Sequence, residues 1–215
     1  MGYNFTITNL GGIVVIDKNA NFKLSYGLFI LTAKEGEKDS GCIINTVQQV
    51  ADGPVKLSVA VNKQNYTHDM IQRTGTFNVS VLDETAAFDV FQRFGFQSGR
   101  DVDKFAGFPK FRMENGIVYV AQSCNAAFSL KVVETVDCGS HTLFIAEVTE
   151  SMVLDKTPSV TYAYYFEHIK PKPQTEKKKG WVCKICGFVY EGDPLPEDYI
   201  CPLCKHGASD FEPLG

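Results

Sequence analysis

Residues 181–215 read WVCKICGFVYEGDPLPEDYICPLCKHGASDFEPLG and contain two C-x-x-C pairs, Cys183 with Cys186 and Cys201 with Cys204. Two residues between paired cysteines let one tight turn present both sulfurs and point backbone N–H groups back at them. Two such turns facing each other form a tetrahedral site of four thiolates. Metal affinity then substitutes for the hydrophobic core that so short a segment cannot build. Geometry leaves iron and zinc both open, because both ions accept four thiolates.

The composition of the whole chain is that of a globular protein. It has 215 residues, 44% of them hydrophobic, with a formal net charge of −4 and a pI of about 5.6. This charge disfavours nucleic acid and anionic membrane as partners. The longest early apolar run, Ile13 to Ile16, is far shorter than a membrane span or a signal-peptide core, so we expect a cytoplasmic protein.

The chain has seven cysteines, an odd number. In a reducing compartment the two C-x-x-C pairs indicate a metal site before they indicate disulfides. Cys42, Cys124 and Cys138 stand in apolar stretches and are expected to be small buried thiols.

A change of composition separates two domains. Residues 170–180, KPKPQTEKKKG, hold two prolines and five lysines and no large apolar side chain. Such a segment cannot bury itself and is expected to be an extended linker. It joins a domain of residues 1–169 to a small domain of residues 181–215, in which six acidic side chains outnumber Lys184 and Lys205.

Residues 1–169 favour strands over helices. β-Branched and aromatic segments predict strands over residues 55–61, 75–82, 117–121, 127–136 and 142–149. Helical patterns are fewer and predict helices over residues 67–73 and 84–94, the second ending at Gly95. Residues 1–22 are expected to add a strand or a hairpin with a turn at Lys18-Asn19. The fold class predicted is mainly β, a barrel with a few helices.

The C-terminal segments CKICGFVYEGD, DYICPLC and DFEPL resemble the rubredoxins, with Trp181, Tyr190, Tyr199 and Phe211 where that family packs its small core. The loop between the cysteine pairs is short, as in the rubredoxin domain attached to rubrerythrins. The resemblance implies one iron ion on four cysteines, a centre that carries one electron; a structural zinc ribbon is the alternative. Lys205 departs from the family, which carries Gly there, and a left-handed backbone at Lys205 would cost about 1 kcal/mol or more.

Residues 24–169 resemble the flavin reductase family, split β-barrels that bind FMN and typically form homodimers. The resemblance rests on the order and spacing of LSYGLFILTA, GCIINTVQQV, VKLSVAVNKQNYTHDMI, TFNVSVL, FGFQSGRDVDKF, CGSHTLFIAEV and TYAYYF. It is strongest for the subgroup that joins this barrel to a C-terminal rubredoxin, the high-molecular-weight rubredoxins. The expected architecture is an FMN-binding split β-barrel followed by a small rubredoxin-like metal-knuckle domain.

Several polar residues could meet FMN, which has a dianionic phosphate, a polar chain and an amphipathic ring. Asn45 and Thr46 follow an apolar strand and could contact the ring. A lysine charge and a helix start form an anion site, and by resemblance the residues there hold the phosphate: Asn62, Lys63, Asn65 and Thr67. Taken singly, these are also ordinary turn, N-cap or solvated residues.

The resemblance assigns further residues to the flavin. Arg100 and Lys104 stand in a loop that approaches the flavin in the family, and a cation there would stabilise an anionic reduced ring. His141 matches a histidine placed beside the flavin, where it can meet the nicotinamide donor; without the resemblance it would be a surface histidine. Tyr162 to Tyr165 are expected to border the same cleft, and His68 could approach the phosphate.

Together the two resemblances imply a flavoprotein that passes electrons from NAD(P)H through FMN to iron and on to an external acceptor, such as a flavodiiron oxygen or nitric oxide reductase. GxGxxG and Walker patterns are absent from the sequence, so the nicotinamide is expected to dock transiently over the flavin. One alternative is a relay that a separate reductase reduces. Another is a non-catalytic FMN-binding protein whose zinc ribbon serves only for docking.

Overall fold

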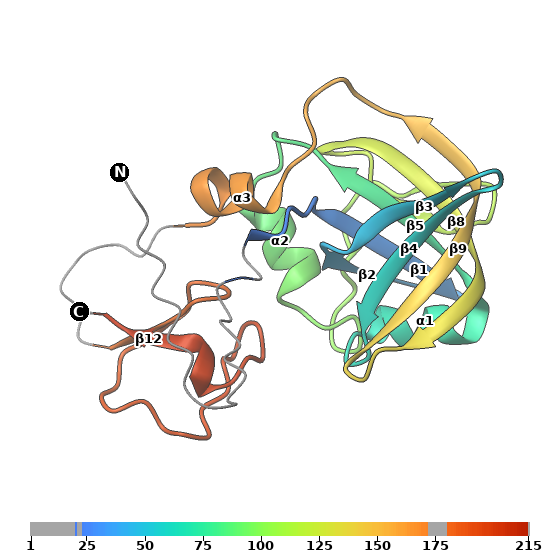
Figure 1. The fold of residues 1–215 in the computed structure, drawn as a ribbon. Coiled ribbons are helices and arrows are strands. Elements are labelled where there is room, and N and C mark those ends of the chain that lie inside the picture. The colour runs from blue at the N-terminus through green and yellow to red at the C-terminus, as the bar shows by residue number, and fades with distance from the viewer. Residues whose placement is uncertain (1–19, 21–22, 172–179, 215) are drawn as a thin grey trace, which may run out of the picture.

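A computed structural model describes residue 20, residues 23–171 and residues 180–214; the hairpin expected in residues 1–22 lies outside these ranges apart from residue 20. Seven strands form one antiparallel sheet in the order β2-β1-β5-β8-β9-β4-β3 (Figure 1). The strands are β1 (Phe29–Glu35), β2 (Lys38–Ile44), β3 (Val47–Asp52), β4 (Val55–Asn62), β5 (Thr76–Leu82), β8 (Cys124–Asp137) and β9 (His141–Val153).

The sheet curls into a barrel that stays open between its two edge strands. β2 pairs with β1 alone and β3 pairs with β4 alone, so the edges do not hydrogen-bond to each other. The long hairpin of β8 and β9 lies in the middle of the sheet, where β8 pairs with β5 and β9 pairs with β4. Asn62, at the end of β4, lies opposite His141, at the start of β9. Helix α1 (Tyr66–Thr74) closes the core, because Met70 and Ile71 pack with Phe77 and Phe144 of the strands. The mainly β prediction is thereby confirmed.

A second core forms outside the barrel around helix α2 (Phe88–Gly95). Phe91 and Phe94 are buried there against Phe105 and the small β6–β7 ribbon (Phe111–Arg112 with Val118–Tyr119). The predicted end of this helix at Gly95 is confirmed.

The predicted start of α2 at residue 84 is wrong by four residues. Asp83 accepts hydrogen bonds from the N–H and hydroxyl of Thr85, and its own carbonyl accepts the N–H of Ala86. This local turn competes with the helix, as acidic side chains at such positions commonly do. The predicted strands at residues 55–61, 75–82, 127–136 and 142–149 are confirmed, while residues 117–121 contain only the short strand β7.

The barrel domain ends in a helical segment that was not predicted, α3 (Tyr162–Tyr164) continuing as a π-helical turn, η2 (Tyr165–Ile169). The sequence TYAYYFEHI is rich in aromatic residues of modest helix propensity, which hides the helix. Thr161 stabilises its start by accepting the N–H of Tyr164 through its hydroxyl. Tyr165 is buried against Phe91, with ring centroids 4.5 Å apart.

The C-terminal residues form a small domain beside α2 and α3 (Figure 1). Its sheet has the order β11-β10-β12, from β10 (Trp181–Cys183), β11 (Val189–Tyr190) and β12 (Phe211–Pro213), with a 3-10 turn η3 (Ala208–Asp210) before β12. The predicted aromatic core is confirmed, since Tyr199 lies 4.6 Å from Tyr190 and 5.4 Å from Phe211, centroid to centroid. No helix in the described ranges is long and apolar enough to cross a membrane.

Candidate functional site: a metal knuckle beside a polar cavity

The four cysteines predicted as metal ligands converge on one point. The Sγ atoms of Cys183 and Cys204 lie 3.5 Å apart, as do those of Cys186 and Cys201, and all four lie within 4.8 Å of one another. A tetrahedral site with metal–sulfur bonds of about 2.3 Å requires sulfurs about 3.8 Å apart. The four side chains therefore fit a tetrahedral metal ion.

Two matching turns hold the sulfurs. In the first, the N–H of Gly187 donates to the carbonyl of Cys183 at 2.8 Å; in the second, the N–H of Lys205 donates to the carbonyl of Cys201 at 2.9 Å. A hydrogen bond from Cys204 lowers the pKa of the Cys186 thiol to about 5, and the Phe188 N–H adds to this effect. A lowered pKa favours the thiolate, the form of cysteine that binds metal.

A polar cavity of about 310 Å³ opens at the N-terminus of α1. Its walls come from four places in the sequence: Cys42 of β2, the start of α1, the end of α2 with the loop after it, and the second metal turn. Its size and its mixture of polar and apolar walls suit part of a cofactor such as a flavin nucleotide. The wall includes Asn65, Thr67, Phe96, Asp101, Lys104, Leu203, Cys204 and Lys205.

The start of α1 presents backbone donors to this cavity. Asn65 is the N-cap, and its side-chain amide donates to Cys42 Sγ at 3.6 Å without capping the helix. Tyr66 and Thr67 follow in the first turn, where backbone N–H groups have no partner within a helix. The Thr67 hydroxyl is bonded to Ser40 at 3.0 Å. The predicted anion site is therefore a helix terminus with its first turn facing a cavity.

Lys104 lies in the wall of the cavity, but its charge is buried. Its Nζ donates to the carbonyls of Gly41 at 2.8 Å and Phe94 at 2.9 Å. Burial lowers the pKa of Lys104, and burial raises the pKa of the neighbouring Cys42 thiol to about 11. Lys104 ties the loop to β2 and α2 and brings a cation to the cavity from within.

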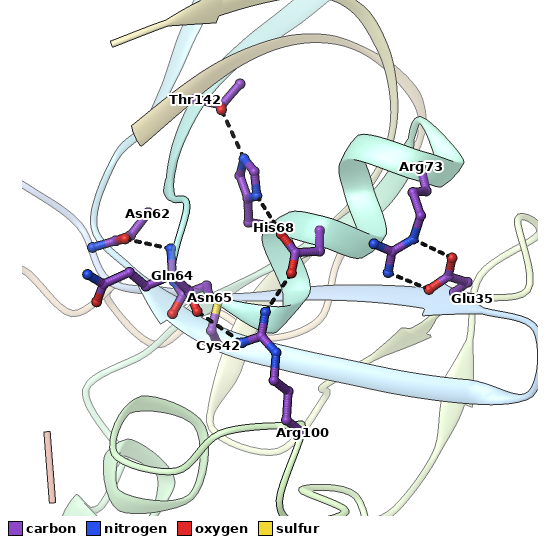
Figure 2. A network of polar contacts seen from close by, with 10 residues as sticks. Glu35, Cys42, Asn62, Gln64, Asn65, His68, Arg73, Arg100 and Thr142 are labelled. Carbon is purple, nitrogen blue, oxygen red and sulfur yellow. Dashed lines mark hydrogen bonds and ion pairs between the residues drawn. The ribbon is translucent and has the colours of Figure 1, made fainter. Parts of the chain in front are cut away.

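Arg100 is held beside the cavity by a network (Figure 2). Its guanidinium contacts Asp69 at 2.5 Å and donates to the Gln64 carbonyl at 3.1 Å. Asp69 in turn lies 3.2 Å from His68 Nδ1, and His68 Nε2 shares a hydrogen bond of 2.9 Å with Thr142. The network fixes the loop of Arg100 against α1 and connects α1 to β9.

His68 does not approach the cavity, contrary to the sequence interpretation. It is buried, and its ring packs on Phe144 with centroids 5.7 Å apart. The reason is the helical phase: Thr67 faces the cavity, and the next residue turns toward the barrel core.

The remaining predicted residues gather beside the cavity, where β4 ends and β9 begins. Asn62 faces His141 across the strands, and Lys63 forms an ion pair of 2.6 Å with Asp137. His141 is half-buried and its Nδ1 lies 2.9 Å from the hydroxyl of Ser140. This group adjoins α1, since the Asn65 N–H donates to the Asn62 carbonyl at 3.0 Å.

Asn45 and Thr46 form the connection from β2 to β3. The Thr46 hydroxyl donates to the Ala60 carbonyl at 2.6 Å, two residues before Asn62. None of Asn45, Thr46, Asn62, Lys63, Arg100 or His141 lines the 310 Å³ cavity itself.

Two other expectations need correction. Cys138 is exposed, because it stands in the turn between β8 and β9 next to Gly139, whereas Cys42 and Cys124 are buried as predicted. Tyr162 and Tyr165 border a different, smaller cavity of about 160 Å³ rather than the one at α1.

The metal domain contacts the barrel at that smaller cavity as well. Ile185, from the first metal turn, lines it together with Phe96 and Tyr165. Phe96 also packs against the core of the metal domain, and Lys170 Nζ donates to the Lys184 carbonyl. The sequence analysis did not predict these contacts, nor that Pro202 to Lys205 line the α1 cavity. No sequence pattern relates segments about a hundred residues apart.

A partly open seven-stranded barrel with a polar cavity, joined to a four-cysteine knuckle, defines the class of split-barrel flavin reductase-like proteins carrying a rubredoxin-like domain. Residues 22–172 match the flavin reductase like domain and residues 181–212 match the rubrerythrin, rubredoxin-like domain. The chain belongs to the flavin reductase family, and it is an oxidoreductase.

Similar proteins share both parts or the barrel alone. The high molecular weight rubredoxin of Moorella thermoacetica is 37% identical, over 93% of this chain and 100% of that protein. A ferric-chelate reductase (NAD(P)H) of Archaeoglobus fulgidus is 36% identical over 75% of this chain and 95% of that protein. Among solved structures, flavoredoxin from Methanosarcina acetivorans superposes with a TM-score of 0.58 at 25% identity, over 66% of this chain and 76% of that chain.

Proposed function

We propose that this protein passes electrons from NAD(P)H through FMN to an iron ion on Cys183, Cys186, Cys201 and Cys204, and from there to an external redox protein. One observation carries the proposal: Cys204 lines the same cavity as Asn65, Thr67 and Lys104. A flavin seated there would be next to a metal ligand. A flavin accepts two electrons together and can release them singly, which suits a one-electron iron centre.

In this proposal the barrel domain is residues 1–169, the linker residues 170–180 and the rubredoxin-like domain residues 181–215. The start of α1 holds the FMN phosphate through its backbone donors, with Asn65 and Thr67 beside them. Lys104 supplies a cation from within the wall, and Arg100 orders the adjacent loop. Asn62 and Lys63, where β4 ends, lie on the phosphate side with them, and Asn45 and Thr46 contact the ring and ribityl region.

The nicotinamide donor would approach from the side of His141. This side chain is half-buried at the first position of β9, opposite Asn62, and so lies at the barrel end that carries the other proposed flavin residues. An imidazole ring can hydrogen-bond a nicotinamide amide. A ferric-chelate reductase (NAD(P)H) of similar sequence supports this choice of donor.

The electron acceptor is proposed to be a flavodiiron protein or a similar redox partner with a basic docking patch. The metal domain carries six carboxylates against two lysines, and such charge favours fast, transient encounters with a basic surface. A homodimer and a cytoplasmic location stay predictions from the sequence.

The test is a visible spectrum of the purified full-length chain, loaded with FMN and iron, before and after anaerobic addition of NADH. Overlapping flavin and ferric-thiolate bands that both bleach support the proposal. Flavin and iron bands that persist after NADH, but bleach with dithionite, show that a separate reductase feeds the protein. Zinc without iron after growth in iron-replete medium contradicts the electron-transfer proposal.

A further inference from the structure

Three charged side chains line the α1 cavity: Lys104 and Asp101 from the barrel domain, and Lys205 from the metal domain. Lys104 and Asp101 cancel in formal charge, so Lys205 is the remaining positive side chain of this wall. Lys205 stands directly after the ligand Cys204 in the second metal turn.

The other cations near the cavity are already engaged. Lys104 donates to two backbone carbonyls, Arg100 is paired with Asp69, and Lys63 is paired with Asp137. Within residues 20, 23–171 and 180–214, the side chain of Lys205 is exposed and has no ion pair or hydrogen bond. It is the cation of the cavity wall that is free to bind an added anion.

The need for such a cation follows from the two anions proposed to share this cavity. Four thiolates around a ferric ion carry a net charge of about −1, and around a ferrous or zinc ion about −2. The phosphate of FMN carries about two further negative charges near neutral pH. Because Cys204 and the start of α1 line one cavity, these charges would repel each other at short range.

The backbone at Lys205 gives a reason to look for a role. Its φ is 62°, in the left-handed region that favours glycine, and the equivalent residue of the first turn is Gly187 with φ 78°. A lysine at such a position carries a conformational cost, and residues in sparsely populated backbone regions cluster at functional sites.

We propose that Lys205 is a flavin-binding residue, supplied to the barrel by the chain's own metal domain, whose ammonium group neutralises the phosphate of FMN at the start of α1. The inference rests on the proposed function, because it assumes FMN in this cavity. It adds that docking of the metal domain and binding of the flavin support each other, as linkage between two binding events requires.

The test uses the full-length chain with zinc in place of iron, which removes redox chemistry and gives the cluster the net charge of its ferrous form. FMN is titrated into flavin-free protein and its fluorescence is followed at low and at high salt. Lys205→Asn removes the charge and tolerates a left-handed backbone. We expect FMN to bind about three- to tenfold more weakly, with a difference that shrinks at high salt.

Two controls sharpen the test. Lys184→Asn removes the same charge from the position after Cys183, in the other metal turn, where Lys184 does not line the cavity. Lys205→Arg keeps a cation at the original position. We expect both variants to bind FMN within about twofold of wild type, and riboflavin, which lacks the phosphate, to bind all variants alike.

An unchanged FMN affinity in Lys205→Asn overturns the inference, and so does an equal loss in Lys184→Asn, which would reflect net charge alone. An equal loss of riboflavin affinity would place Lys205 away from the phosphate and also overturn it. Failure of wild-type protein to bind FMN would instead contradict the proposed function.

Discussion

Gly187 and Lys205 occupy equivalent positions in the two metal turns, each one residue after the second cysteine of a C-x-x-C pair. Their φ angles are 78° and 62°, and both donate their N–H to the carbonyl of the first cysteine of the pair. Both turns therefore have the same left-handed backbone geometry at this position. Glycine favours it in the first turn, whereas lysine in the second turn does not.

Lys205→Gly should stabilise the metal domain. Glycine removes the steric cost of a left-handed side chain, partly offset by its greater freedom in the unfolded chain, for a net gain of about 0.5–1 kcal/mol. The measurement is the denaturant concentration at which the metal–thiolate absorbance of the full-length protein is lost. The matched change is Gly187→Ala, which should destabilise the same domain by about 1 kcal/mol, since its Cβ would meet no atom closer than 3.9 Å and only the backbone is strained. Shifts of the same sign in both variants would contradict this reasoning.

Thr142→Val should destabilise the barrel. Thr142 is buried and shares a 2.9 Å hydrogen bond with His68, so valine leaves a buried ring nitrogen without its partner. We expect the free energy of unfolding to fall by about 1–3 kcal/mol. Denaturant unfolding of the full-length protein measures it. In the double variant with His68→Phe both polar groups are gone, and most of the loss should be recovered; a double variant as unstable as the single one would argue against the hydrogen bond.

Asn65→Asp should separate flavin binding from folding. Asn65 caps α1 without a side-chain hydrogen bond to the helix, and its amide donates only a long bond of 3.6 Å to Cys42 Sγ. Aspartate loses that bond but is an equally good N-cap and favours the helix dipole, so stability should change little. Its carboxylate faces the proposed phosphate site, where FMN affinity should fall about tenfold or more. Fluorescence titration of zinc-loaded protein gives the affinity, and riboflavin should lose much less. Equal losses for both ligands would place the phosphate elsewhere.

Removal of the metal should unfold residues 181–214 and leave the barrel intact. Among the described residues, the buried apolar and cysteine side chains of this domain are Val182, Cys183, Cys186, Cys201 and Phe211, so three of the five are metal ligands. Without the ion, the partly buried aromatics alone cannot hold so small a domain. Limited proteolysis after chelation should cut within the metal domain while a fragment of barrel size persists. Resistance of both domains to cleavage would show that the small core folds without metal.

The local signals in the sequence account for much of this fold. The alternation of apolar residues predicts β4, β5, β8 and β9. The C-x-x-C spacing predicts four metal ligands, the first and last of which are 21 positions apart in the sequence. The left-handed backbone at Lys205 was also predicted, from the Gly that the rubredoxins carry there. The start of α2 was missed because the Asp83 side chain forms a turn that the helical pattern of phenylalanines does not reveal.

The candidate site was harder to predict, because its parts meet only in three dimensions. The sequence analysis identifies Asn65, Thr67 and Lys104. It does not show that Lys104 donates to two carbonyls or that Arg100 pairs with Asp69, because both contacts depend on how the loop after α2 folds. The contribution of Leu203 and Lys205 to the cavity depends on domain packing across a linker, for which one sequence holds no periodic or spacing signal.

Lys104→Met should change how stability depends on pH. Burial lowers the pKa of Lys104 in the folded protein from its ordinary value of 10.5. Between that lowered pKa and 10.5 the unfolded chain binds more protons than the folded one, so the contribution of Lys104 to the free energy of unfolding rises with pH. The cost of burying the charge is thus fully present below the lowered pKa and is relieved above 10.5.

The methionine variant cannot titrate at this position, and every other alkaline group is common to both proteins. The stability of wild type minus that of Lys104→Met should therefore increase from about pH 7 to about pH 10. Below pH 7 the methionine variant removes a buried charge but also leaves the carbonyls of Gly41 and Phe94 without their donor. The balance of these two effects decides which protein is more stable there. Denaturant unfolding at both pH values measures the difference. A constant difference between the two proteins over this pH range would contradict a lowered pKa of Lys104 in the folded protein.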